Sequence, residues 1–174
     1  MSSPSKKNRL WIWFFVFVVV ASIALAGFMI WFNLRLQLTS EKLEEARALW
    51  REHGPKDYLL TVTKKFGKEG NADTFKIKVR AGRVMEVRMN GELLRNQVTD
   101  EVFPPGDDRL QYYSMDRMFV DIERFLEKDA KEGQKNYNVA LFDERTGAIR
   151  RYVRSERASR MHVEEEAMVE PLAP

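Results

Sequence analysis

Three short stretches hold most of the residues whose side chains could do chemistry. Residues 142–154, FDERTGAIRRYVR, place two acids, a threonine and four arginines around one glycine. His162 begins an alternating His-Glu-Glu pattern near the C-terminus, and Asp107 and Asp108 follow a Pro-Pro-Gly turn. Such side chains can act as general acids and bases, bind anions or ligate metal ions.

The spacing argues against a metal site in the last two stretches. On one face of a strand, side chains two residues apart are separated by ~6–7 Å, so His162, Glu164 and Glu166 are too widely spaced to surround one ion. Asp107 and Asp108 lack the alternating oxygen ligands and the later glutamate of a calcium-binding loop. We therefore expect no metal and no other cofactor.

Recognisable catalytic motifs are missing from the sequence. It contains no phosphate-binding loop, dinucleotide-binding fingerprint, nucleophile elbow or zinc-protease motif. His53 falls in the last turn of a predicted helix, where an imidazolium suits the helix dipole. Ser114 is placed to cap a helix, so we do not expect it to attack a substrate. We expect no catalytic residue and predict that the protein is not an enzyme.

Residues 142–154 are best interpreted as a β-hairpin. The Asp-Glu-Arg-Thr-Gly run is typical of turns, and Gly147 can adopt the positive φ that a turn requires. We expect Ile149 and Val153 to face a core and the neighbouring arginines to lie in solvent.

Basic side chains on the solvent face of the predicted sheet are the candidate binding surface. They are Lys76, Lys78, Arg80, Arg88, Arg150, Arg151 and Arg154. Such a face can meet anionic lipid headgroups, acidic glycans or an acidic partner protein. Alternatively, these charges only keep the sheet soluble, and Glu86, Glu164 and Glu166 interrupt the patch.

The charge distribution argues against a nucleic-acid-binding protein. The chain of 174 residues has 29 Lys and Arg and 26 Asp and Glu, a formal charge of +3. Lys6, Lys7 and Arg9 account for the whole excess, because no acidic residue precedes Glu41. Nucleic-acid-binding domains carry a basic patch or stripe, whereas the chain after this tail is formally neutral. With no cysteine in the sequence, disulfides, thiol catalysis and cysteine metal sites are excluded.

Residues 10–32 form an uncharged apolar run of membrane-spanning length. A helix needs about 20 such residues to cross the ~30 Å hydrocarbon core, and Trp11, Trp13 and Trp31 would lie at its two interfaces. A cleavable signal peptide is the alternative, but the apolar run continues past its Ala-Leu-Ala site. We predict a signal-anchor protein with four parts: a basic tail (1–9), a transmembrane helix (10–32), a juxtamembrane connector (33–40) and a soluble domain (41–172).

The basic tail predicts the orientation of this anchor. Under the positive-inside rule, the N-terminus is cytoplasmic and the soluble domain lies outside the cytoplasm. Arg35, Lys42 and Arg47 on the other side of the membrane segment reduce this bias.

The remaining sequence predicts a two-layer α+β domain. Helices are expected at residues 40–53 and 114–132, because apolar residues recur there on one face and a glycine follows. Strand patterns occur at residues 57–66, 75–80, 83–89, 136–142, 148–155 and 160–169. We expect Met85, Val87 and Met89 to face the core. A helix followed by three strands occurs twice, which suggests a duplicated αβββ unit with one antiparallel sheet and both helices on one face.

Three segments carry a resemblance to a known family. They are the Trp50…Asp57-Tyr58 opening, the MDRMFVDIERFL helix, and the FDERTGAI hairpin followed by HVEEEAMVE. In their order and spacing, over residues 43–171, they resemble a bacterial family of small lipoprotein-type and secreted domains of unknown function. The resemblance implies the α+β fold and an extracytoplasmic location, and it implies no activity.

These observations predict a single-pass membrane protein of the cell envelope whose extracytoplasmic domain acts as a binding or scaffold module. Its expected partners are the lipid bilayer and either an envelope protein or an anionic ligand. One alternative is a cell-envelope enzyme that uses carboxylates, for example on glycans. The other, with inverted topology, is a regulator that faces the cytoplasm.

Overall fold

The N-terminal part of the chain is one long apolar helix. The computed structural model describes residues 6–67, 72–134, 136–157, 159 and 161–172, and it divides into two units, Met1–Gln37 and Leu38–Pro174. The first unit contains α1 (Lys6–Leu36). Within α1, Trp11–Met29 is long and apolar enough to cross a membrane, and such a segment serves either as an anchor or as a signal sequence.

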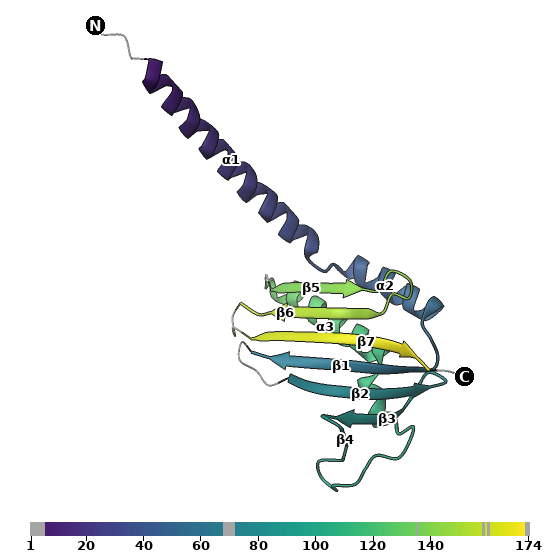
Figure 1. Ribbon diagram of the computed structural model, residues 1–174. Helices are drawn as coiled ribbons and strands as arrows, with labels where there is room; N and C mark the ends of the chain where they lie inside the picture. Colours follow the sequence, from purple (N-terminus) through teal and green to yellow (C-terminus); the bar gives the residue numbers. More distant parts are fainter. Residues whose placement is uncertain (1–5, 68–71, 135, 158, 160, 173–174) are drawn as a thin grey trace. The chain divides into compact units, whose positions relative to one another are not determined.

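The second unit is a seven-stranded antiparallel sheet with helices on one face (Figure 1). Its helices are α2 (Ser40–His53), the short 3₁₀-helix η1 (Asp108–Tyr113) and α3 (Met115–Glu132). Its strands are β1 (Tyr58–Phe66), β2 (Ala72–Arg80), β3 (Arg83–Met89), β4 (Glu92–Leu93), β5 (Tyr137–Phe142), β6 (Ile149–Ser155) and β7 (His162–Pro171). They lie in the order β4-β3-β2-β1-β7-β6-β5, which confirms the predicted α+β class.

Capping residues set the ends of the two α-helices in this unit. The Ser114 hydroxyl caps α3 by accepting a hydrogen bond from the Arg117 N–H at 3.2 Å, as predicted. Gly133 ends α3 in the left-handed conformation, with φ 63°. The cap of α2 is Thr39, one residue before the predicted helix start.

The hydrophobic core lies between the two helices and the sheet. Trp50 of α2 meets the ring of Tyr58 edge-on at 5.4 Å, and Phe119 of α3 stacks on Phe142 at 6.4 Å. Phe119 and Leu60 of β1 are fully buried. One apolar cluster therefore joins both helices to the same face of the sheet.

A β-bulge between β2 and β3 changes which residue is buried at the start of β3. Lys78 pairs with Glu86, but Val79 pairs with Val84, so Met85 is the extra residue. Val84 is buried at the position where Met85 was expected. Met85, which was predicted to face the core, is only half-buried, because an inserted residue shifts the alternation of a strand. Met89 lies beyond the bulge, on the same face as the buried Val87, and is exposed near the end of the strand.

A second bulge, between β5 and β6, has a larger effect. Leu141 pairs with Arg151, but Phe142 pairs with Ile149, so Arg150 is the extra residue. Beyond it, Tyr152 and Arg154 turn toward the helices and are buried. Val153 lies on the opposite face. Val153 was predicted to face the core and Arg154 the solvent, and the structure shows the reverse.

The sheet order does not confirm a duplicated unit. Each half contains a helix followed by three antiparallel strands. At the centre of the sheet, the first half contributes its first strand, β1, whereas the second half contributes its last strand, β7. A two-fold rotation that keeps the helices on one face would bring the same strand of each half to the centre. The similarity of the halves is therefore limited to the order of elements along the chain.

Candidate functional site

A pocket lies between α3 and one end of the sheet. It encloses about 330 Å³, at the lower end of the ~300–1,000 Å³ typical of ligand sites. Its sheet side comes from β1, β2, β6 and β7, with Val62 and Phe75 among the lining residues. Its helix side comes from η1 and α3, including Met118 and Ile122. The pocket is therefore built mainly of apolar side chains that belong to the core.

The opening of this pocket has an apolar rim. Phe66 is 51% exposed and Met161 is 45% exposed, although both line the pocket. Tyr112 and Phe125 also combine exposure with contact to the pocket. Large apolar side chains grouped at the mouth of a hollow are typical of a site that receives an apolar ligand.

Each charged side chain of the lining is paired. Lys64 and Glu165 form an ion pair at 2.9 Å, and Asp121 lies 3.0 Å from the guanidinium of Arg117. Arg154, the remaining charged lining residue, binds Asp129. The pocket thus presents no unpaired charge from the described residues, which suits an uncharged, apolar ligand.

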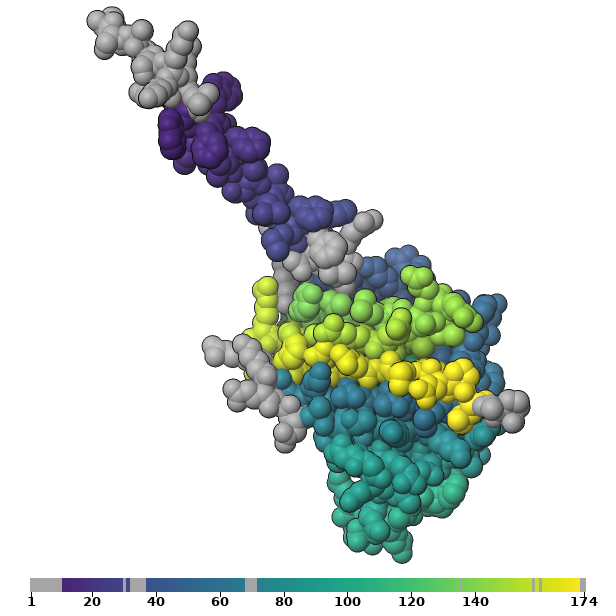
Figure 2. All heavy atoms as spheres, viewed as in Figure 1, coloured from purple at the N-terminus to yellow at the C-terminus, as the bar shows by residue number. Residues whose placement is uncertain are grey.

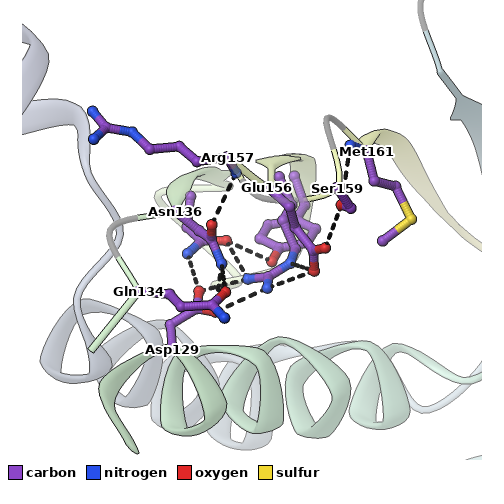
Figure 3. A network of polar contacts seen from close by, with 10 residues as sticks. Asp129, Gln134, Asn136, Glu156, Arg157, Ser159 and Met161 are labelled. Carbon is purple, nitrogen blue, oxygen red and sulfur yellow. Dashed lines mark hydrogen bonds and ion pairs between the residues drawn. The ribbon is translucent and has the colours of Figure 1, made fainter. Parts of the chain in front are cut away.

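A buried polar network (Figure 3) borders the pocket, and two of its members, Tyr152 and Arg154, are lining residues. Arg154 donates two hydrogen bonds to the carboxylate of Asp129, at 2.6 and 2.9 Å. Asn136 and Asn138 donate two more to the same carboxylate, at 2.8 and 2.9 Å. The hydrogen bonds from Arg154 are the main cause that lowers the pKa of Asp129 to about 2.

The same network holds Tyr152 and Phe125 in place. The Tyr152 hydroxyl donates to Asn138 at 3.1 Å, and burial raises the pKa of Tyr152, so the phenol stays protonated. The Arg154 guanidinium lies 4.7 Å from the centre of the Phe125 ring. With its acceptors occupied, the network is suited to fixing the pocket wall and not to catalysis.

Sequence reasoning missed this network, although one signal was present. Asp129 continues the apolar stripe of α3, three and four residues beyond Leu126 and Phe125, so a charged residue stands on the core face. Arg154 was expected in solvent, and its side chain is only 3% exposed. A pair could not be predicted because the bulge at Arg150 decides which way Arg154 points.

The FDERTG segment is a turn, as predicted, and it docks against a helix. The Asp143 carboxylate accepts hydrogen bonds from the backbone of Arg145 and Thr146 and from the Thr146 hydroxyl, at 3.1, 2.9 and 3.0 Å. These bonds, first those from Thr146, lower the pKa of Asp143. Gly147 has φ 73° and lies against the backbone of α2 near Ala46. Asp143 and Thr146 therefore stabilise the turn through these hydrogen bonds.

The other residues considered for metal binding or catalysis have local partners. His162 Nδ1 lies 2.8 Å from the Ser155 hydroxyl, and Glu164 accepts from Arg151 Nε at 2.8 Å. Asp107 caps η1, and hydrogen bonds from Arg109 lower its pKa to about 2. Among the described residues, no group of three or more His, Asp or Glu side chains is placed to hold a metal ion.

The predicted basic surface is divided by the structure. Lys76 and Lys78 project from β2 on the face opposite the core, since Ile77 and Val79, which alternate with them, are buried. Arg80, Arg88 and Arg151 pair with Asp57, Glu86 and Glu164, and Arg150 is the exposed bulge residue. Arg154 lies behind the sheet in the buried network. The seven residues therefore do not form one continuous patch.

Comparison with known proteins identifies a family. The model of a "Family of unknown function (DUF6174)" matches residues 42–146, from α2 to the β5–β6 turn, which includes α3 and part of the pocket. No curated protein and no solved structure matches the chain. The match covers more than half of the sequence, so the protein belongs to the DUF6174 family, whose function is unknown, as the resemblance to an uncharacterised domain predicted.

Proposed function

We propose that this protein is a single-pass membrane-anchored binding module that takes an apolar ligand chain into the pocket between α3 and the sheet. One observation carries the proposal: the pocket has apolar walls, paired charges and an exposed apolar rim. Transfer of an alkyl chain from water to such a site is worth ~0.8 kcal/mol per buried methylene.

The apolar helix supports a membrane setting for this binding. If α1 anchors the chain, the domain is confined near the bilayer, where its effective concentration toward membrane components is high. The basic tail favours a cytoplasmic N-terminus and an extracytoplasmic domain. We therefore propose the acyl chain of a membrane lipid as the ligand.

Binding is better supported than catalysis by the chemistry of the pocket. An enzyme that works through carboxylates needs an acid that is free to exchange a proton with substrate. The pocket acids Glu165 and Asp121 are each engaged by a basic side chain. We therefore assign the domain a binding role, without a catalytic residue or a cofactor.

Photo-crosslinking of the full-length protein in lipid nanodiscs tests the proposal. A palmitic acid that carries a diazirine near its methyl end should label peptides of β1, α3 and β7 that line the pocket. Val163 lines the pocket, so V163W should fill it and remove this labelling. The control V98W adds the same side chain at a loop position that is 91% exposed and should leave labelling unchanged. Labels confined to α1, or equal in V163W, would contradict the proposal.

A further inference from the structure

The sheet face opposite the helices is not covered by any described helix of the second unit. Figure 2 shows this open face, with β7, β6 and β5 on one side and β1 and β2 on the other. Its central strand is β1, which lies between β2 and β7. The side chains of Leu59, Thr61 and Thr63 point to this face, because Tyr58, Leu60 and Val62 between them are buried.

Opposite charges flank this neutral central strand in a defined register. Leu59 pairs with Lys78 on one side and with Glu170 on the other. Thr61 pairs with Lys76 and with Met168. One row across the sheet is therefore Lys-Leu-Glu, and the next is Lys-Thr-Met.

The charges in these rows, and Glu166 in the next row along β7, have no ionic partner within the described part of the chain. Neither Lys76 nor Lys78 on β2 has a salt bridge there, and neither do Glu166 and Glu170 on β7. Their neighbours differ: Arg88 pairs with Glu86, and Arg151 pairs with Glu164. Four unpaired charges, two of each sign, thus stand on either side of β1.

We infer that this open face binds the open face of a second copy of the same chain. A two-fold axis that runs along β1, between two facing sheets, carries β2 of one copy over β7 of the other. Residues of one row then stay in that row, so Lys78 meets Glu170 of the second copy, and Glu170 meets its Lys78. Lys76 meets Met168, between Glu166 and Glu170. The surface is self-complementary, as a two-fold interface requires.

Packing across this face also has room for the lysine stems. Facing sheets lie ~10 Å apart, with strands within about 30° of each other. A broad depression of about 1020 Å³ lies over β6 and β7, lined by Thr61, Met168 and Leu141 among others. The lysine methylenes of the second copy enter it while their ammonium groups reach the glutamates. Met168 and Leu141, which are exposed in the single chain, become covered.

Charge reversal in the full-length protein, in detergent micelles, tests this pairing. We expect dimers by sedimentation equilibrium, and K78E and E170K should each weaken dimerisation at least about tenfold because like charges then face each other. The double variant K78E/E170K should dimerise again. An equimolar mixture of the two single variants should form heterodimers, since each supplies what the other lacks.

Site-specific cross-linking separates this interface from contacts made by α1. The natural chain has no cysteine, so T61C introduces one thiol near the axis, and a bismaleimide with a spacer of about 8 Å should join two copies. The exposed control K128C on α3 should not cross-link. Monomeric wild-type protein, single variants that dimerise like wild type, or failure of the mixture to associate would each overturn the inference. None of these outcomes depends on whether the pocket binds a ligand.

Discussion

At the scale of single residues, Gly147 is where local turn chemistry and tertiary packing meet. Its φ of 73° lies in the left-handed region that favours glycine. A Cβ there would overlap the Ala46 carbonyl oxygen and would lie 2.8 Å from the Trp50 nitrogen and 2.9 Å from the Leu49 Cβ. The absence of a side chain lets the β5–β6 turn touch the α2 backbone.

We expect G147A to lower the free energy of unfolding by about 2–3 kcal/mol, from backbone strain and overpacking together. The matched control is G82A, because Gly82 has φ 74° but a Cβ added there would meet no atom within 4 Å. That variant should cost only about 1 kcal/mol, from strain alone. Urea denaturation followed by circular dichroism measures both. An equal loss in the two variants would show that contact with α2 is unimportant.

At the scale of elements, the Asp129–Arg154 pair joins the end of α3 to β6, and the two asparagines join both to β5 and its preceding loop. The Asp129 and Arg154 side chains are 9% and 3% exposed, so each charge depends on the other. Breaking a buried pair by removing one partner is costly because the remaining charge stays buried. The network therefore fixes one element against the next and shapes the pocket wall.

This pair predicts how stability depends on pH. The pKa of Asp129 falls from the ordinary 3.8 to about 2 in the folded state, so folding favours the ionised form. The stabilisation is complete above pH 5 and is lost as pH falls from about 4 to 2, by about 2 kcal/mol. D129N should be about 3 kcal/mol less stable than wild type at pH 7.

Other carboxylates also titrate in this range, so the informative quantity is the difference between wild type and D129N. That difference should shrink by about 2 kcal/mol between pH 5 and pH 2. It is measured by urea denaturation at each pH. A difference that stays constant over this range would mean that Asp129 is not the group responsible.

At the scale of the whole molecule, the chain combines an apolar helix with a domain that has its own core. None of the helix segment Trp11–Met29 is buried against other parts of the chain. The core of the second unit, in contrast, is one continuous cluster of apolar side chains. A segment of the first kind is long and apolar enough to cross a membrane. This division is why we propose that α1 anchors a domain with a separate binding role.

The proposed orientation is tested by a reporter enzyme that is active only outside the cytoplasm, fused after Pro174. Intact cells should show activity, because the basic tail holds the N-terminus inside. The same fusion without residues 1–32 should be inactive. Activity of a cytoplasm-specific reporter at the same position, with none from the first fusion, would reverse the proposed topology.

Much of the fold could be predicted from local pattern. The two helices, the caps of α3 and the strand segments follow from periodicity and from residues such as Ser114 and Gly133, because these signals act within a few residues. The cap of α2 is Thr39 and not the predicted Ser40. The candidate site could not be predicted in the same way. Its lining comes from α3, η1 and four strands, including Val62 and Phe125, which lie far apart in the chain.

The sequence alone determined what depends on composition and short range: an apolar helix of membrane length, an α+β domain and a hairpin at FDERTG. Only the tertiary structure decided the order of strands, the buried place of Arg154 and the pocket. The physical reason is the period of two in a strand. A single bulge residue, such as Arg150, turns every following side chain to the other face, and whether a bulge forms depends on pairing with another strand.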